Sequence, residues 1–168
     1  DWGELDFLLI DLPPGTGDIH LSIVQALPIT GAVVVSTPQN IALADAKKGV
    51  AMFQQKNINV PVLGIVENMS YFTPEELPEN KYYIFGQDGA KNLADDIQTK
   101  FLGEVPLVQG IREAGDVGHP VALQEKTPLE KAFQEITRNM LSELLERNEN
   151  LPATEVVKIT TMSGCSTK

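Results

Sequence analysis

The sequence predicts an α/β fold: a doubly wound, mostly parallel sheet flanked by helices and incomplete at its N-terminal side. Three apolar runs predict buried strands at residues 7–12, 32–37 and 62–67. They are rich in Val, Ile and Leu and do not alternate with polar residues, as expected of strands covered on both faces. Helical patterns at residues 18–26 and 41–55 separate these runs, which gives the βαβ order of a doubly wound fold.

Composition narrows the classes of function. The chain has 168 residues, of which 42% are hydrophobic and 21% charged, as in an ordinary globular domain with one core. Its net charge of −10 argues against nucleic-acid binding, which needs a basic surface to displace counterions from phosphates. The same charge disfavours an anionic membrane surface, so we expect neither nucleic acid nor membrane as a partner.

Cysteine usage and the chain start bear on the compartment. Cys165 is the single cysteine, so there is no disulfide framework and no CxxC pair. This suits a reducing compartment, and we expect a cytoplasmic protein.

The chain does not begin with Met and opens in the middle of a strand-like pattern. We therefore expect a piece of a longer protein, with the first strands of the sheet missing and a hydrophobic edge that needs cover.

The second half of the chain predicts shorter elements and one long helix. We expect a long structured loop at residues 68–86, a helix at 88–100, a strand at 101–105 and a helix at 111–116. Thr127 is the expected N-cap of the long helix, with Pro128 at its first position. Its apolar face is expected in the core and consists of Leu129, Phe133, Ile136, Met140 and Leu144. Residues 1–148 then form the domain, and residues 149–168 form a polar, mobile tail.

The stretch LLIDLPPGTGD at residues 8–18 holds the first candidate site. An Asp at the carboxyl end of a parallel strand, here Asp11, lies where ligands bind in open α/β sheets, and its carboxylate suits Mg²⁺. By itself Asp11 could equally cap the next loop. In the following loop Pro13 stiffens the exit, Gly15 and Gly17 let backbone N–H groups approach an anion, and Thr16 adds a hydroxyl. Together they predict a γ-phosphate sensor.

Two further candidates have alternative interpretations. Asp18 is either the N-cap of the following helix or a carboxylate that orients an attacking water molecule, and both can hold. Asn68 follows the third apolar run, where its side-chain amide could read the edge of a purine base. Local sequence alone favours the alternative that Asn68 forms a turn.

Several stretches resemble one known family. IDLPPGTGD at residues 10–18, STPQNIALADAKKGVAMF at 36–53 and VPVLGIVENMSYF at 60–72 are similar to the Mrp/ApbC family of P-loop ATPases. This family is the iron–sulfur cluster carrier branch of the MinD/ParA-like deviant Walker ATPases. GEVPL at 103–107 and IREAGDVGHPV at 111–121 extend the resemblance, which covers residues 5–147.

The resemblance implies a P-loop NTPase-like fold, hydrolysis of ATP with Mg²⁺, and a homodimer that delivers [4Fe–4S] clusters to apo iron–sulfur proteins. It implies that Asp11 is the Walker B aspartate, which holds Mg²⁺ through water. Residues 13–18 then match the switch II loop, which responds to the γ-phosphate. Asn68 matches a position that contacts adenine, and the loop after Pro106 matches one that lies along the base.

Two parts of the family pattern are not in this sequence. The glycine-rich KGGVGKS-type loop, which carries most phosphate contacts, would precede residue 1, so we expect this chain by itself to be inactive on ATP. The family's CxxC would follow NMSYF, where the sequence instead reads TPEELPENKYYIFG. Soft thiolates hold iron–sulfur clusters. Either Cys165 from each of two subunits holds the cluster, or the cargo is lost or changed.

The leading hypothesis is therefore an ATP-binding and ATP-hydrolysing iron–sulfur cluster carrier. The alternative is a MinD/ParA-like regulatory or positioning ATPase without a cluster. A membrane-bound form of this alternative would need an amphipathic basic helix at the C-terminus, and ATEVVKITTMSGCSTK is neither long nor basic enough. A third hypothesis is a non-enzymatic interaction module that uses the aromatic residues of the loop at 68–86.

Overall fold

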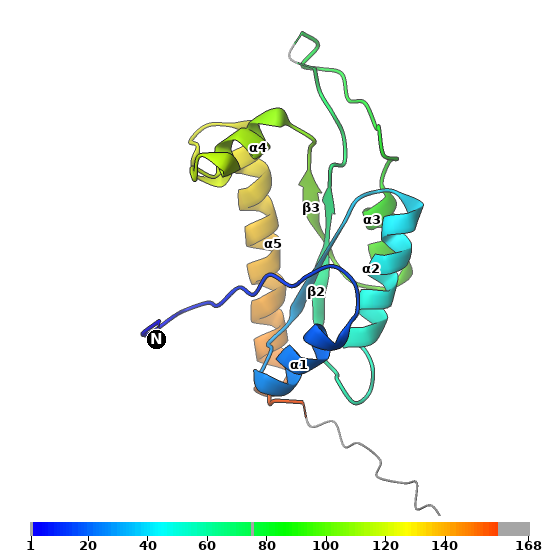
Figure 1. Ribbon diagram of the computed structural model, residues 1–168, viewed down its shortest axis with the longest axis vertical. Coiled ribbons are helices and arrows are strands. Elements are labelled where there is room, and N and C mark those ends of the chain that lie inside the picture. The colour runs from blue at the N-terminus through cyan, green and yellow to red at the C-terminus, as the bar shows by residue number, and fades with distance from the viewer. Residues whose placement is uncertain (1, 75, 158–168) are drawn as a thin grey trace, which may run out of the picture.

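The computed structural model describes residues 2–74 and 76–157, and Figure 1 shows how its elements are arranged. In this part of the chain the strands β1 (Ala32–Ser36), β2 (Val62–Asn68) and β3 (Phe101–Val105) form one parallel sheet in the order β1-β2-β3. The helices are α1 (Asp18–Ala26), α2 (Asn40–Phe53), α3 (Gly89–Asp96), α4 (Gln109–Asp116), the 3-10 helix η1 (Val121–Leu123) and α5 (Pro128–Asn150).

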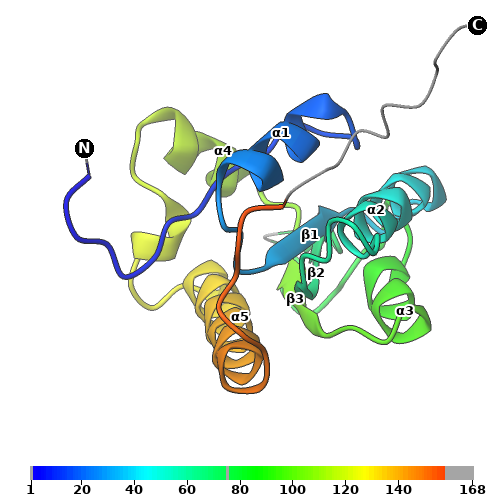
Figure 2. The same ribbon diagram turned by 90° about the horizontal axis from the view of Figure 1, so that it is seen from below.

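The sheet is the middle of three layers. Helices α2 and α3 cover one face and α5 covers the other, as Figures 1 and 2 show from two directions. Alternate residues of β2 serve the two faces, since Ile65 packs with Ala46 and Leu93 while Val66 packs with Leu102 on the α5 side. The predicted α/β fold with a parallel sheet between helices is confirmed.

The long helix begins as the sequence predicts. Thr127 is its N-cap, and the Thr127 Oγ1 accepts a hydrogen bond of 3.0 Å from the backbone N–H of Glu130. Phe133 and Ile136 pack against the cluster of Val66, Leu102 and Val105. The predicted core position of this apolar face is confirmed in part: Met140 also packs against that cluster, but no residue of α5 is fully buried. Since α5 is amphipathic, the side chains outside its sheet-facing stripe stay accessible to solvent.

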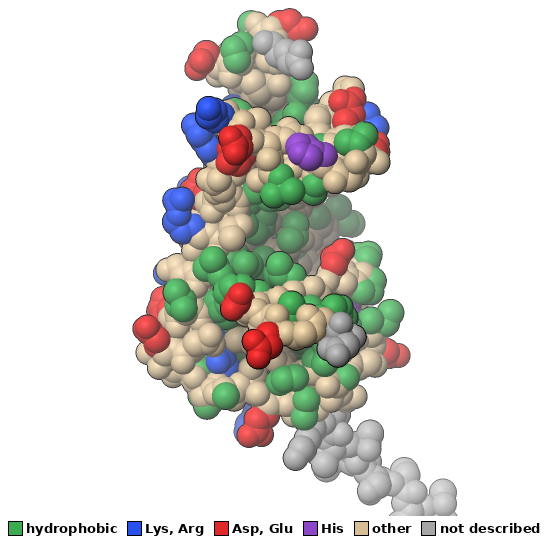
Figure 3. Space-filling view, turned by 90° about the vertical axis from the view of Figure 1, so that its left-hand side faces the viewer, with side chains coloured by type: hydrophobic (Ala, Val, Ile, Leu, Met, Phe, Trp, Pro, Cys, Tyr) green, Lys and Arg blue, Asp and Glu red, His purple; other side chains and the backbone are tan. Residues whose placement is uncertain are grey.

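Residues 7–12 do not form the predicted strand. The side chains of Phe7, Leu8 and Leu9 are 59%, 53% and 79% exposed, and the segment has no regular secondary structure. Figure 3 shows hydrophobic side chains gathered on this side of the molecule. A strand needs a neighbour for its backbone hydrogen bonds, and within the described residues β1 pairs with β2 alone. β1 is therefore an edge strand, and its Val35 is 61% exposed.

Three further predictions need correction. The N-cap of α1 is Gly17, not Asp18, and no side chain caps this helix. Helix α3 ends at Asp96, before the predicted Lys100, because Gln98 adopts the left-handed conformation with φ of 54°. Helix α5 continues to Asn150, two residues past the predicted end of the domain at residue 148.

The chain after α5 turns back onto the domain. The backbone N–H of Val157 donates a hydrogen bond of 3.0 Å to the carbonyl oxygen of Val24 in α1. Val157 thereby joins the cluster that contains Val24 and Ala32. Among the described residues, no helix combines the length and the apolar character needed to cross a lipid bilayer.

Candidate functional site

The carboxyl ends of β2 and β3 bring Asn68 and Pro106 together. Asn68 is the last residue of β2, and in the parallel register its partner on β3 is Val105, the residue before Pro106. Asn68 is half-buried and Pro106 is buried. In open α/β sheets ligands bind at this edge, outside the carboxyl ends of the strands. The two residues predicted to contact a base are thus neighbours at the expected edge.

The Asn68 side chain takes part in a turn. Its Oδ1 accepts a hydrogen bond of 2.9 Å from the backbone N–H of Met69, which has a φ of 55°. This is the turn that local sequence favours. The bond uses one lone pair of Oδ1 and leaves the two Nδ2 donors and the second lone pair for a ligand. The turn and a base contact are therefore compatible.

Ser70 ties the end of β2 to the end of β3. Both its backbone N–H and its Oγ donate to the carbonyl oxygen of Val105, each at 3.1 Å, and its side chain is fully buried. One step further along, the backbone N–H of Leu107 donates to the carbonyl oxygen of Tyr71 at 2.7 Å. The two loops that follow Asn68 and Val105 are thus joined by direct hydrogen bonds.

Glu67 connects the same strand end to α3. Its side chain is 2% exposed, and its Oε2 accepts a hydrogen bond of 2.7 Å from the backbone N–H of Ala90, in the first turn of α3. Burial raises the pKa of the Glu67 carboxyl. The bond from Ala90 lowers this pKa, while the charges of Glu104 and Asp88 raise it, and the net result is a raised value.

Residues 69–74 and 76–88 belong to an arm that projects beyond the carboxyl ends of the strands, as Figure 1 shows. Phe72 and Tyr82 pair as an antiparallel bridge, with two N–H to O hydrogen bonds of 2.8 Å each. At the root of the arm the Lys81 Nζ lies 3.7 Å from the ring centroid of Tyr71 and 3.3 Å from the Glu104 carboxylate. Partial burial lowers the pKa of Lys81, but Tyr71 and Glu104 outweigh it and the pKa is raised overall.

An open depression of about 610 Å³ lies beside the arm. Its lining comes from the arm, the chain after Pro106 and α4, and consists of Phe72, Ile84, Leu107, Val108, Gln109 and Arg112. The floor is apolar, and polar groups of α4 stand at one side. Since the lining comes from segments that are separate in the sequence, no local pattern could have predicted it.

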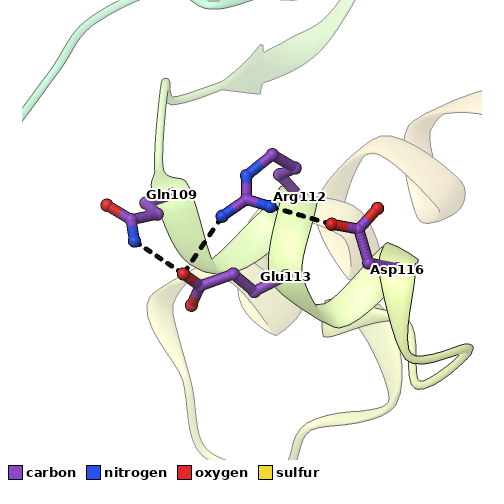
Figure 4. A network of polar contacts seen from close by, with 4 residues as sticks. All are labelled: Gln109, Arg112, Glu113 and Asp116. Atoms are coloured by element: carbon purple, nitrogen blue, oxygen red, sulfur yellow. Dashed lines mark hydrogen bonds and ion pairs between the residues drawn. The ribbon is translucent and has the colours of Figure 1, made fainter.

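The polar side of this depression is a hydrogen-bonded network on α4, shown in Figure 4. The Arg112 guanidinium contacts the Asp116 carboxylate at 2.8 Å and the Glu113 carboxylate at 3.2 Å. Gln109 Nε2 donates to the same Glu113 oxygen at 2.6 Å. These side chains are exposed, so each ion pair contributes little to stability. Their contacts satisfy the charge of Arg112 within its own helix.

The residues predicted to sense the γ-phosphate do not lie at this edge of the sheet. Asp11, Pro13, Gly15, Thr16, Gly17 and Asp18 are all exposed. Leu12, in the middle of this stretch, packs against the cluster that contains Val24 and Ala32, and Ala32 is the first residue of β1. The stretch is therefore anchored at the amino end of the sheet, and the structure does not bring Asp11 together with Asn68.

In residues 2–74 and 76–157 there is no group of three or more His, Cys, Asp or Glu side chains that could hold a metal ion. The candidate thiolate ligand, Cys165, lies outside the described residues.

Sequence reasoning missed Glu67 and Ser70. Both are buried polar residues near Asn68 in the sequence. Glu67 lies in β2, whose other buried residues include Leu63, Ile65 and Val66, and Ser70 lies two residues past the end of that strand. The signal available in the sequence was that two side chains with hydrogen-bonding groups flank Asn68 at the end of an apolar run. Their partners, Ala90 and Val105, could not be inferred from spacing.

The fold has counterparts among solved structures. The nucleotide-binding protein of Archaeoglobus fulgidus, solved in complex with ADP, aligns with a TM-score of 0.64 and 41% identity, over 76% of this chain and 50% of that chain. The cell division ATPase MinD of Pyrococcus furiosus aligns with a TM-score of 0.58 and 24% identity, over 82% of this chain and 52% of that chain. The second likeness concerns the fold alone.

Relatives in sequence are named for iron–sulfur chemistry. The chain is 50% identical over 153 residues to the iron–sulfur cluster transfer protein NUBPL of Mus musculus, covering 90% of this chain and 46% of the relative. It is 46% identical over 141 residues to the iron–sulfur cluster carrier protein of Synechocystis, covering 83% of this chain and 39% of the relative. The chain thus spans about half the length, or less, of these curated relatives. Its residues 1–141 match the family described as ParA: NUBPL iron-transfer P-loop NTPase, and the chain belongs to that family.

Proposed function

We propose that this chain contributes the base-binding side of an ATP-binding and ATP-hydrolysing iron–sulfur cluster carrier. The observation that carries the proposal is that Asn68 and Pro106 are neighbours at the carboxyl ends of β2 and β3. The 41% identity to a protein solved with ADP supports a nucleotide as the ligand. The iron–sulfur carriers among the relatives support a cluster as the cargo.

Asn68 is proposed to read the adenine base. A side-chain amide that donates through Nδ2 and accepts through Oδ1 is complementary to the N7 acceptor and N6 donor of adenine. Guanine has an acceptor oxygen in place of that N6 donor, so the same amide would discriminate against it. Pro106 and the chain after it would then lie along the base.

The phosphate side of the proposed site rests on the family resemblance. Asp11 and Asp18 are proposed for the reacting end, with Pro13, Gly15, Thr16 and Gly17 as the segment that senses the γ-phosphate. In this structure the stretch is exposed and anchored at the amino end of the sheet. A lysine-bearing phosphate loop is not among the 168 residues, so we expect them by themselves not to turn over ATP.

A magnesium ion accompanies ATP in phosphoryl transfer. Asp11 is the residue proposed to hold it through water. Mg²⁺ needs an octahedral set of oxygen ligands, and no cluster of acidic side chains forms around Asp11 in the described residues. The groups present do not by themselves fit the ion.

The cluster is proposed as cargo, held between two copies of the chain. The relatives' names support transfer of a cluster to apo iron–sulfur proteins. The sequence has one thiol, Cys165, and two subunits would therefore supply two thiolate ligands. A single cysteine without a disulfide partner is consistent with the reducing cytoplasm, which we propose as the compartment.

The ATPase part of the proposal is tested by Asp11→Asn in the full-length protein, with turnover of ATP as the readout. We expect turnover to fall by about tenfold or more, because the variant loses the negative charge that the family resemblance places at the reacting end. Asp6→Asn is the matched control, since Asp6 is also exposed in the same N-terminal segment. Equal turnover in the parent and in Asp11→Asn would remove Asp11 from the mechanism.

The alternative function, a regulatory or positioning ATPase without a cluster, is favoured by the missing CxxC in the arm. Anaerobic reconstitution of the full-length protein with iron and sulfide separates the two. A [4Fe–4S] absorbance band in the parent that is lost in Cys165→Ser supports the carrier with the proposed ligand. If neither protein acquires a band while ATP binding persists, the regulatory function is the correct one.

A further inference from the structure

We infer that Glu67 and Ser70 are positioning residues, which hold the Asn68 amide in place for the base of a bound adenine nucleotide. The inference rests on the proposed function and goes beyond it by assigning two buried polar side chains. They flank Asn68 on both sides in the sequence, and each is hydrogen-bonded to a different neighbouring element.

On the β3 side, Ser70 sets the spacing of the two loops that would hold the base. Its N–H and Oγ both donate to the carbonyl oxygen of Val105, which directly precedes Pro106. A movement of Asn68 away from Pro106 would have to break these bonds. The hydroxyl therefore contributes to the distance between the residue that would read the base edge and the residue that would lie along the base.

On the face of the sheet that α3 covers, Glu67 holds the carboxyl end of β2 against α3. Its carboxylate accepts from the Ala90 N–H at 2.7 Å, and both residues are almost fully buried. The donor lies in the first turn of the helix, where backbone N–H groups have no partner within the helix and favour a negative charge. Rotation of β2 about its axis at Asn68 would separate this pair.

Apolar side chains would give this strand end more hydrophobic burial than Glu67 and Ser70 do. A buried polar group costs free energy unless it is hydrogen-bonded. Hydrogen bonds are directional, however, whereas hydrophobic contacts have no preferred direction. Between the two anchors Met69 adopts the left-handed conformation with φ of 55°, which most residues avoid. Two directional bonds around a constrained turn are suited to orienting one side chain, the Asn68 amide.

The test compares the affinities of ADP and GDP for the full-length protein and for its Ser70→Ala variant. The variant loses the hydroxyl and keeps the backbone bond. We expect the preference for ADP over GDP to fall by about threefold to tenfold, the effect of one hydrogen bond. Thr99→Ala is the matched control, because Thr99 Oγ1 donates at 3.1 Å to the Val62 carbonyl at the other end of β2. If Ser70 only stabilises the fold, Ser70→Ala and Thr99→Ala should both lower the free energy of unfolding, and neither should change the preference for ADP over GDP. That result would overturn the inference.

A second pair of variants keeps the inference testable if Ser70→Ala does not fold. Glu67→Gln retains an oxygen that can accept from Ala90, whereas Glu67→Met has a similar size and no such acceptor. We expect Glu67→Gln to retain the preference for ADP and Glu67→Met to lose part of it. An equal preference in these two variants overturns the positioning role while the proposed function stands. Absence of ADP binding in the parent protein overturns the proposed function and this inference together.

Discussion

The carboxylate of Glu67 accepts a hydrogen bond of 2.7 Å from the backbone N–H of Ala90, inside the layer between β2 and α3. Burial raises the pKa of this carboxyl. The bond from Ala90 lowers the pKa, the charges of Glu104 and Asp88 raise it, and the net result is a raised pKa. A group with a raised pKa binds its proton more tightly in the folded state than in the unfolded state. The free energy of unfolding therefore falls as the pH rises from the ordinary carboxyl range through the folded pKa.

The first prediction is that Glu67→Gln weakens this pH dependence. Urea unfolding between pH 4 and pH 8 should show a smaller loss of stability for the variant than for the parent, because the amide does not titrate. Glu113→Gln is the control, since Glu113 is exposed on α4 and the change in charge is the same. A parent-like slope in Glu67→Gln would show that other groups set the pH dependence.

The second prediction concerns packing between β2 and β3. A Cβ at Gly64 would lie 2.5 Å from the Leu102 side chain and 2.7 Å from the Lys100 carbonyl oxygen. Gly64→Ala should lower the free energy of unfolding by about 1–3 kcal/mol, as overpacked cores do. Gly49→Ala, in the interior of α2 with nothing within 4 Å of its Cβ, should raise it by about 0.5–1 kcal/mol. Urea unfolding measures both, and effects of the same sign would argue against the packing described.

The third prediction tests the start of α5. Thr127→Ala removes the acceptor of the Glu130 N–H and should cost about 1 kcal/mol in urea unfolding. Thr137→Ala is the control in the same helix. The Thr137 hydroxyl bonds to the Phe133 carbonyl, which already belongs to the helix, so its loss should be close to neutral. If Thr137→Ala is the more costly change, the cap is not what stabilises the helix start.

The fourth prediction concerns the exposed N-terminal segment. Leu9 is 79% exposed, so Leu9→Ser should change the free energy of unfolding by less than about 0.5 kcal/mol. The same change should lower the binding of an apolar dye such as ANS, because it removes exposed hydrophobic surface. A loss of about 2 kcal/mol or more would mean that residues 7–12 are buried as a strand in solution.

The strands and the long helix could be predicted because their causes are local. A strand that is buried on both faces requires a continuous apolar run, and such runs predict β1 and β2. The sequence Thr-Pro-Leu-Glu at residues 127–130 predicts the Thr127 cap. Residues 7–12 carry the same apolar pattern without forming a strand. An apolar pattern predicts that a segment is buried. Whether the segment forms a strand depends on whether another strand lies alongside it.

The candidate site was predictable in part for the same reason. Asn68 and Pro106 could be placed at strand ends because each follows an apolar run. Glu67 and Ser70 could not be assigned, since their hydrogen-bond partners lie 23 and 35 residues further along the chain. Asp11 was expected at the carboxyl end of the sheet because residues 7–12 were predicted to form a strand. Since that strand does not form, Asp11 does not lie at the expected edge.

The central claim is that Asn68 belongs to a nucleotide-base site at the carboxyl ends of β2 and β3. Calorimetric titration of ADP into the full-length protein and its Asn68→Ala variant tests it most directly, with Asn80→Ala, an exposed amide of the arm, as control. We predict that the parent and Asn80→Ala bind ADP alike and that Asn68→Ala binds about tenfold more weakly, as for a lost hydrogen-bonding amide. Equal affinity in all three proteins, or no binding by the parent, would contradict the account.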